Sequence, residues 1–172
     1  GVTRIRDIAV IGVTPYKTTV GQGLTLKINV TVTNEGDYTE TFDVTLYYDD
    51  VIIETQTVTS LAPTASKKLT FSWNTTGVTP GFNYTIWAEA SVVPGETDIA
   101  DNVYIDGAVK VKLLGDLNGD RIVNIIDLVL LRAAYGSTPT QPNWNPDADL
   151  NQDGFINIFD ALIVGGHYWE TC

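Results

Sequence analysis

The first two thirds of the chain alternate apolar and polar residues with a period of two, the pattern of a β-strand with one buried face. In residues 24–33 every second side chain from Leu24 to Val32 is apolar, and Thr, Lys and Asn fill the positions between them. The alternation recurs in residues 42–48, 69–73, 82–88 and 109–113, and Gly, Pro, Asn and Asp turns separate the runs. In residues 82–88 it predicts that Phe82, Tyr84, Ile86 and Ala88 face the core and Trp87 the opposite side.

About seven strands in roughly 110 residues, with no helical period, favour a mainly β fold of the immunoglobulin-like sandwich type. A closed barrel is the alternative. The one cysteine, Cys172, leaves no partner for an internal disulfide. We therefore predict a disulfide-free β-sandwich over residues 1–114.

The pattern changes after residue 114 to a duplicated loop followed by a helix. Residues 116–127 return 33 positions later as residues 149–160, and the apolar segments 125–135 and 158–164 that follow have helical character. Gly136 is a suitable helix stop. Each half is a loop and one helix, or half of an EF-hand, so we predict a small all-α region over residues 115–172.

Both loops place oxygen-bearing side chains at positions 1, 3, 5, 9 and 12, the spacing by which a twelve-residue loop surrounds one calcium ion. These residues are Asp116, Asn118, Asp120, Asn124 and Asp127 in the first loop and Asp149, Asn151, Asp153, Asn157 and Asp160 in the second. The backbone carbonyls of Ile122 and Phe155, at position 7, complete the predicted shells. Helix-capping turns are the alternative for one such loop, but two aligned copies favour two Ca²⁺ ions. Mg²⁺ fits less well because it needs a stricter octahedral shell.

Charge and composition exclude several functions. The formal net charge of −11 argues against nucleic acid, whose phosphates require clustered cations. No apolar run approaches the roughly 20 residues of a membrane span, and the first residues lack the apolar core of a signal peptide. One histidine, His167, and one cysteine leave no Ser/His/Asp or Cys/His catalytic set and no Cys/His zinc site. We therefore expect that the protein is not an enzyme. The carboxylate pairs Asp49/Asp50 and Asp98/Asp101 lie in turns, where an Asp side chain usually accepts hydrogen bonds from the backbone.

The tandem D-x-N-x-D-x-x-x-N-x-x-D loop and helix in residues 115–172 resembles a type I dockerin, the module that docks onto cohesin domains in extracellular cellulosome-like assemblies. Residues 7–112 are similar to the cell-adhesion-related bacterial and archaeal domains (CARDB), through Gly21-Gln22-Gly23, Val32-Thr33-Asn34-Glu35-Gly36, and Pro94-Gly95-Glu96-Thr97-Asp98 with Asp101-Asn102. The resemblance implies a secreted or cell-surface protein. It also implies that positions 10 and 11 of each loop face the cohesin, with Arg132 beside them; these residues are Ile125, Ile126, Ile158 and Phe159.

The first loop departs from the dockerin pattern at position 6. The second loop has the usual glycine, Gly154, whereas the first has Arg121. Because a non-glycine residue with positive φ costs about 1 kcal/mol, we expect the first loop to bind calcium more weakly.

The sequence thus predicts a non-catalytic extracellular assembly module, with the sandwich as a spacer or adhesion module. The alternative makes the sandwich a carbohydrate-binding module of a polysaccharide-degrading protein, with Trp87, Tyr47 and Tyr16 as an aromatic platform. Three N-x-T sequons, at Asn29, Asn74 and Asn83, are candidate glycosylation sites. The alternative is that these Asn and Thr residues are simply polar residues on the solvent-exposed face of the sandwich.

Overall fold

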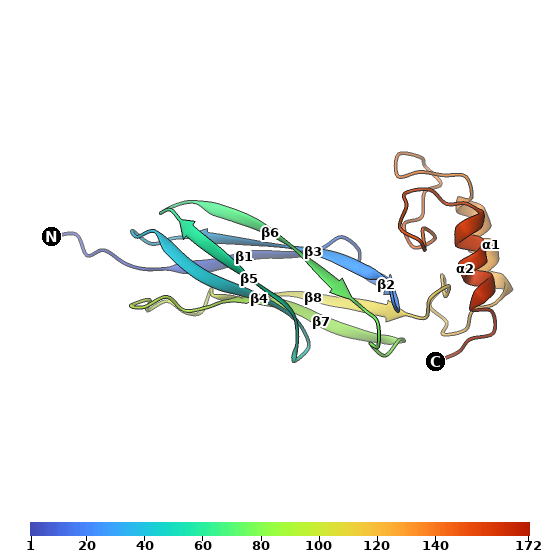
Figure 1. The fold of residues 1–172 in the computed structure, drawn as a ribbon, viewed down its shortest axis with the longest axis horizontal. Coiled ribbons are helices and arrows are strands. Elements are labelled where there is room, and N and C mark those ends of the chain that lie inside the picture. Colours follow the sequence, from blue (N-terminus) through green and yellow to red (C-terminus); the bar gives the residue numbers. More distant parts are fainter. The chain divides into compact units, whose positions relative to one another are not determined.

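The computed structural model describes residues 1–172, with eight strands and two helices (Figure 1). The strands are β1 (Ile8–Pro15), β2 (Thr19–Gly21), β3 (Thr25–Asn34), β4 (Glu40–Tyr48), β5 (Val51–Leu61), β6 (Ser66–Asn74), β7 (Phe82–Ala90) and β8 (Val103–Lys112), and the helices are α1 (Ile125–Ala134) and α2 (Ile158–Gly166). The predicted mainly β region followed by two short helices is confirmed.

The strands form two separate sheets, so the fold is a sandwich and not a closed barrel. One sheet has the order β1-β3-β6 and the other β2-β8-β7-β4-β5. β1 pairs antiparallel with β3, and β4 pairs antiparallel with both β5 and β7. β2 is the exception, because it pairs in parallel with the end of β8.

The predicted alternation gives the core of the sandwich, with one error. The inward positions of β3, β4, β6 and β8 are buried, and they include Leu26, Ile28, Val30, Val32, Val44, Leu46, Phe71, Trp73, Val109 and Val111. In β7, Ile86 and Ala88 are buried as predicted, but Phe82 is 55% exposed. Phe82 is the first residue of its strand, where no strand of the opposite layer is required to cover it.

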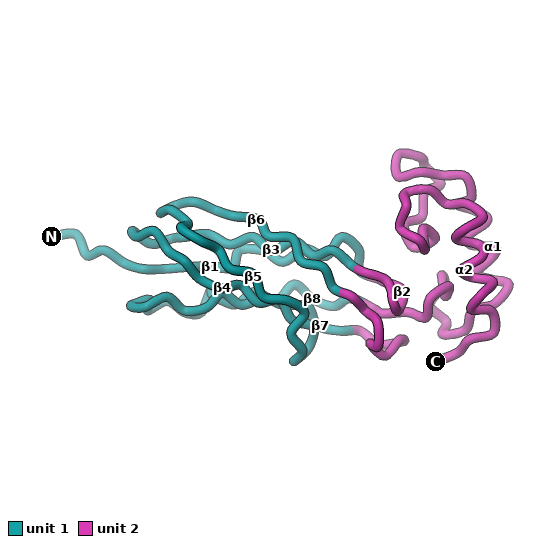
Figure 2. The backbone as a smooth tube through the Cα atoms, viewed as in Figure 1, with its two compact units in different colours: residues 1–18, 26–73, 84–109 teal, residues 19–25, 74–83, 110–172 magenta.

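The chain divides into two compact units (Figure 2). Unit 1 consists of residues 1–18, 26–73 and 84–109, and unit 2 of residues 19–25, 74–83 and 110–172. Unit 2 has its own apolar core, which consists of Leu113, Leu117, Val123, Leu131, Ala134, Ala148, Leu150, Ile156 and Val164. Trp144 packs against this core from the Pro-rich connection between the repeats. Neither helix has the length and apolar character needed to cross a membrane.

Each helix begins with a capping box. Asn124 and Asn157 are the N-caps, and the side chain of each accepts a hydrogen bond from the helix, while Asp127 and Asp160 accept from the N-cap amides. α1 ends just before Gly136, which has a φ of +80° and is the predicted stop. The two repeats therefore start their helices in the same way.

Candidate functional site

The first duplicated loop winds around the side chain of Asp116, at position 1. Asp116 Oδ1 accepts a hydrogen bond from Gly119 N at 2.6 Å, and Oδ2 accepts one from Arg121 N at 3.0 Å. At position 5, Asp120 Oδ1 accepts from Ile122 N at 3.0 Å, and Oδ2 accepts from Asn118 Nδ2 at 2.8 Å. Positions 1, 3 and 5 thus lie in one tight turn.

The second loop repeats most of this network. Asp149 Oδ2 accepts from Gly154 N at 3.0 Å, and Asp153 Oδ1 accepts from Phe155 N at 2.9 Å. Asn151 Nδ2 donates to Asp153 Oδ2 at 2.9 Å. One contact differs, because Asp149 Oδ1 accepts from Asp153 N at position 5, whereas Asp116 Oδ1 accepts from Gly119 N at position 4.

Position 12 joins the two ends of each loop. Asp127 and Asp160 are fully buried. Asp127 Oδ1 accepts from Leu117 N and Oδ2 from Asn124 N, both at 2.8 Å. Asp160 makes the same two bonds, to Leu150 N and Asn157 N, again at 2.8 Å. A buried carboxylate needs such partners, and here they hold the loop closed.

The donor set of each loop fits a hard cation. Three carboxylates and two side-chain amides supply oxygen alone, which suits Ca²⁺ and does not suit a zinc site built on Cys or His. The predicted residues would hold the ion, with the position-7 carbonyls of Ile122 and Phe155 beside them. The ion would supply the positive charge that these carboxylates need when they are held in one loop.

Backbone strain is shared between the loops, contrary to the expectation from position 6. Arg121 has a φ of +73° and Gly154 one of +81°, so position 6 is left-handed in both loops. Position 4 is also left-handed, and there the first loop has Gly119 (φ +77°) and the second has Gln152 (φ +60°). Each loop therefore carries one strained non-glycine residue, and the argument for a weaker first loop fails.

The loops are also cross-connected through position 8. Val123 N donates to Glu170 O at 3.0 Å, and Trp169 N donates to Val123 O at 2.8 Å. Ile156 bonds in the same way to the segment after the other helix, with Ile156 N donating to Ser137 O at 3.1 Å and Gly136 N donating to Ile156 O at 2.8 Å. Each loop is thus tied to the chain that leaves the helix of the other.

The four apolar residues at loop positions 10 and 11 lie on the surface. Ile125 and Ile126 are 59% and 50% exposed, and Ile158 and Phe159 are 53% and 61% exposed. The next helical turn adds Val129 (59%) and Leu162 (62%), which sequence reasoning missed although they follow Ile125 and Ile158 by four residues. We call Ile125, Ile126 and Val129 the α1 stripe, and Ile158, Phe159 and Leu162 the α2 stripe.

The stripes differ at their far ends. Arg132 is exposed in the last turn of α1, whereas α2 ends in Gly165 and Gly166. A basic side chain near the C-terminus of a helix also complements the helix dipole, so Arg132 has a structural role available as well.

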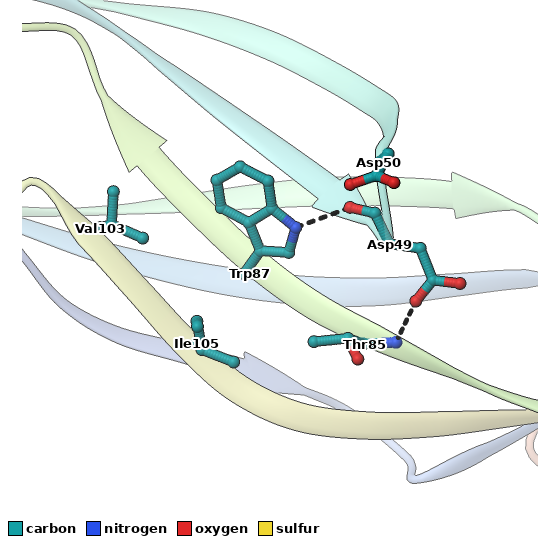
Figure 3. A pocket seen from close by; sticks show the side chains of 6 residues that line it. All are labelled: Asp49, Asp50, Thr85, Trp87, Val103 and Ile105. Atoms are coloured by element: carbon teal, nitrogen blue, oxygen red, sulfur yellow. Dashed lines mark hydrogen bonds between the residues drawn. The ribbon is translucent and has the colours of Figure 1, made fainter.

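A shallow hollow of about 430 Å³ lies on the sandwich and is lined by Asp49, Asp50, Thr85, Trp87, Val103 and Ile105 (Figure 3). Trp87 is on the outer side of β7, as predicted, and stacks on Tyr47 with ring centroids 4.0 Å apart. Trp87 Nε1 donates to Asp49 O at 2.7 Å. Tyr16, the third ring of the predicted platform, follows β1 in the other sheet and does not line this hollow.

The turn interpretation of the acidic pairs holds for some members only. Asp49 Oδ1 accepts from Thr85 N at 2.8 Å, and Asp98 Oδ1 accepts from Ala100 N at 3.3 Å. Asp101 differs, because its buried Oδ1 has no hydrogen-bond partner. One carboxylate oxygen of Asp101 lies with one from Asp7 and one from Glu35, all within 4.8 Å of one another. Sequence reasoning did not bring these three residues together, because they come from three distant segments.

Burial raises the pKa of Asp7 above its ordinary value, and the carboxylates of Asp101, Asp98, Glu35 and Glu96 raise it further. Burial likewise raises the pKa of Asp101, with the largest charge effect coming from Asp98. The fold thus holds several negative charges together at one place in the sandwich.

Comparison with known families decides what the chain is. A model of the CARDB family matches residues 6–106, which is more than half of the 172 residues. The chain belongs to the CARDB family. A model of the type I dockerin domain matches residues 114–167, so a dockerin domain follows the CARDB domain. Both resemblances seen in the sequence are confirmed.

Individual relatives match parts of the chain. The CARDB domain of a Pyrococcus furiosus protein, crystallised in complex with di-metal ions, is 27% identical with a TM-score of 0.54, and the match covers 66% of this chain and 99% of that one. Cellulosomal-scaffolding proteins B and A of Acetivibrio thermocellus are each 28% identical over 80 residues, or 46% of this chain. The match covers 10% of protein B and 4% of protein A, so this chain spans a tenth or less of their length.

Proposed function

We propose that this chain is a non-catalytic extracellular assembly module whose dockerin domain binds a cohesin domain when both loops hold Ca²⁺. The observation that carries the proposal is the exposure of the α1 and α2 stripes. Apolar side chains in so small a domain are needed for its core, yet these six are at least half exposed. Exposed apolar residues gathered on a helix are typical of a surface that a partner buries.

Calcium connects the loops to this surface. The last ligand of each loop, Asp127 or Asp160, is also the third residue of its helix and accepts from the N-cap amide. Positions 10 and 11 are the first two residues of the same helix. An ion that fixes the loop therefore fixes the start of the stripe, which makes cohesin binding calcium-dependent. The CARDB domain acts as the spacer or adhesion module.

The test measures binding of the full chain to a panel of cohesin domains, with calcium and with chelator. We expect Ile125→Asp/Ile126→Asp to abolish binding and to leave calcium affinity and helix content unchanged, with Arg132 favouring this copy over the second. Loss of binding only when Ile158→Asp/Phe159→Asp is added would mean that either stripe can serve. The matched control is Val51→Asp/Ile52→Asp, which changes two exposed apolar residues of the sandwich.

Full-strength binding by the variant with both stripes changed would overturn the proposal. So would binding that is unaffected by chelator, because the ion would then have no part in forming the surface.

A polysaccharide is the second candidate ligand, and the hollow beside Trp87 favours it. A tryptophan on an outer sheet face, stacked on a tyrosine and flanked by Asp49 and Asp50, offers an apolar ring and polar groups to a sugar. Titration with soluble oligosaccharides should quench tryptophan fluorescence in the wild type and not in Trp87→Ala. Val103→Ala, at the rim of the hollow, should weaken binding less. No response to any oligosaccharide would remove this candidate.

The sequons stay predictions. Asn74 and Asn83 are exposed, while Asn29 is half-buried and accepts from Thr70 Oγ1 at 2.8 Å. We expect higher glycan occupancy at Asn74 and Asn83 than at Asn29. Mass spectrometry of the protein secreted by its own host measures this occupancy.

We also propose that the CARDB domain takes up divalent cations; the similar Pyrococcus furiosus CARDB domain was crystallised in complex with di-metal ions. Support comes from the sandwich itself, where the buried Oδ1 atoms of Asp7 and Asp101 have no hydrogen-bond donor. A hard cation fits such oxygens.

A further inference from the structure

We infer that the cation site of the CARDB domain is formed by Asp7, Glu35 and Asp101, and that an ion bound there cross-links three separate segments of the sandwich. This inference rests on the proposed cation uptake and adds its location. The site is distinct from the two dockerin loops, which lie in residues 116–160.

The three carboxylates come from segments that the backbone already holds together. Asp7 lies just before β1, Glu35 just after β3, and Asp101 in the connection from β7 to β8. Asp7 O accepts from Glu35 N at 2.9 Å, and Asp101 O accepts from Val10 N at 2.8 Å. The carboxylates are thus brought together by main-chain bonds that do not depend on an ion, so little order has to be gained on binding.

Two oxygens in this cluster lack the hydrogen bonds that buried carboxylate oxygens normally have. Asp7 Oδ1 and Asp101 Oδ1 are both buried without a partner. The next residue, Asn102, is 2% exposed, and its Oδ1 is also unpartnered. Leaving a buried acceptor unpaired is costly, and such groups are rare in native proteins. By contrast, the nearby Glu96 is fully used, since it accepts from Ile8 N, Val93 N and Asn102 Nδ2.

The charge balance points the same way. The neighbours that raise the pKa of Asp7 through their charge are all carboxylates. The cation closest in sequence, Arg6, is directed elsewhere, with Nη1 on Glu40 Oε1 at 2.5 Å and its guanidinium carbon 4.4 Å from the centre of the Tyr38 ring. A divalent ion would supply the missing positive charge. Oxygen ligands alone select a hard cation such as Ca²⁺, Mg²⁺ or Mn²⁺.

The site is open on one side. Asp7 and Asp101 are half-buried, whereas Glu35 is exposed. An ion can therefore enter from solvent and keep water ligands, which completes a shell that three side chains cannot fill.

The experiment uses the full chain and Mn²⁺, whose unpaired electrons broaden the NMR signals of nearby amides. We expect broadening around residues 7, 35 and 101, in addition to the two dockerin loops. Asp7→Asn/Asp101→Asn should abolish the broadening in the sandwich and leave that in the loops. In the same variant, the number of calcium ions bound per chain, measured by calorimetry, should be lower by one than in the wild type. Asp106→Asn, an acidic residue of β8 outside the cluster, is the control and should change neither result.

The outcomes separate the site from the broader proposal. Broadening elsewhere in the sandwich, unaffected by Asp7→Asn/Asp101→Asn, would leave cation uptake standing and overturn this site. No broadening anywhere in residues 1–109 would overturn both.

Discussion

Arg121 and Gln152 are the two non-glycine residues that the dockerin loops hold in the left-handed region. Each costs about 1 kcal/mol relative to glycine, so Arg121→Gly and Gln152→Gly should each tighten calcium binding by their own loop, by roughly fivefold. Calorimetry on the two variants measures this.

A side-chain contact has to be separated from the strain, because Arg121 Nη2 also donates to Gly81 O at 3.2 Å. Arg121→Ala removes that bond and keeps the strained backbone, so it should not tighten the first loop. Weaker binding by both glycine variants would show that the loop conformation is already free of strain.

Gly36 is required for a different reason, which is space. A Cβ on this residue would lie 2.8 Å from Asp7 N and 2.9 Å from Ile5 O, closer than real Cβ atoms come to backbone. We expect Gly36→Ala to lower the free energy of unfolding of the sandwich by about 2 kcal/mol, measured by urea unfolding. Gly12→Ala is the control, since a Cβ there meets nothing within 4 Å. Equal effects of the two changes would contradict this explanation.

The helices of the dockerin domain depend on the loops that precede them. Asn124 and Asn157 are both predicted ligands and N-caps, and two short helices have little core to offset chain entropy. Without calcium the six loop carboxylates repel one another. Chelator should therefore abolish the helical far-UV circular dichroism, while the near-UV signal of Trp73, which stacks on Tyr48 inside the sandwich, should persist.

Returning calcium in excess should restore the helical signal, and this step is the control for irreversible damage. Helix content that is the same with and without chelator would contradict the coupling of ion binding to folding.

Most elements were predictable because their side chains repeat with the period of the structure. The alternation located β3, β4, β6, β7 and β8, and the duplicated loops located both helices. Strands β1, β2 and β5 lie outside the alternating runs. β1 begins with three buried residues in a row, β2 has only three residues, and β5 is mostly exposed, so none of them shows a clear period. Phe82 was misplaced because the pattern does not mark where burial ends. Only the family resemblance pointed to the residues at loop positions 10 and 11, and Val129 and Leu162 were missed, since apolar residues are by default expected inside.

The acidic cluster could not be predicted from the sequence pattern, for a different reason. Asp7, Glu35 and Asp101 become neighbours only through the pairing of β1 with β3 and the return of the chain into β8. Such contacts depend on topology, which alternation does not specify. A sequence pattern finds sites that lie within one loop, and it misses sites assembled from several.

For the whole molecule, ion binding should change the net charge measurably. Two Ca²⁺ ions carry four positive charges, so filling both dockerin loops changes the formal charge from −11 to −7. Free-solution electrophoresis should show mobility toward the anode reduced by about a third, with a further decrease if the sandwich binds an ion. Magnesium at the same ionic strength is the control for screening. Unchanged mobility on adding calcium would mean that the loops stay empty.

The parallel pairing of β2 with β8 has a consequence for how the protein is made. It joins Thr19–Gly21 to Lys110–Lys112, and β8 is an inner strand between β2 and β7. During synthesis β8 is therefore the last strand to be made, and the first dockerin loop follows directly after it. Until then β7 has an open edge that can pair with another chain. We expect this closure to be slow, because pairing between residues far apart in the sequence forms late in folding.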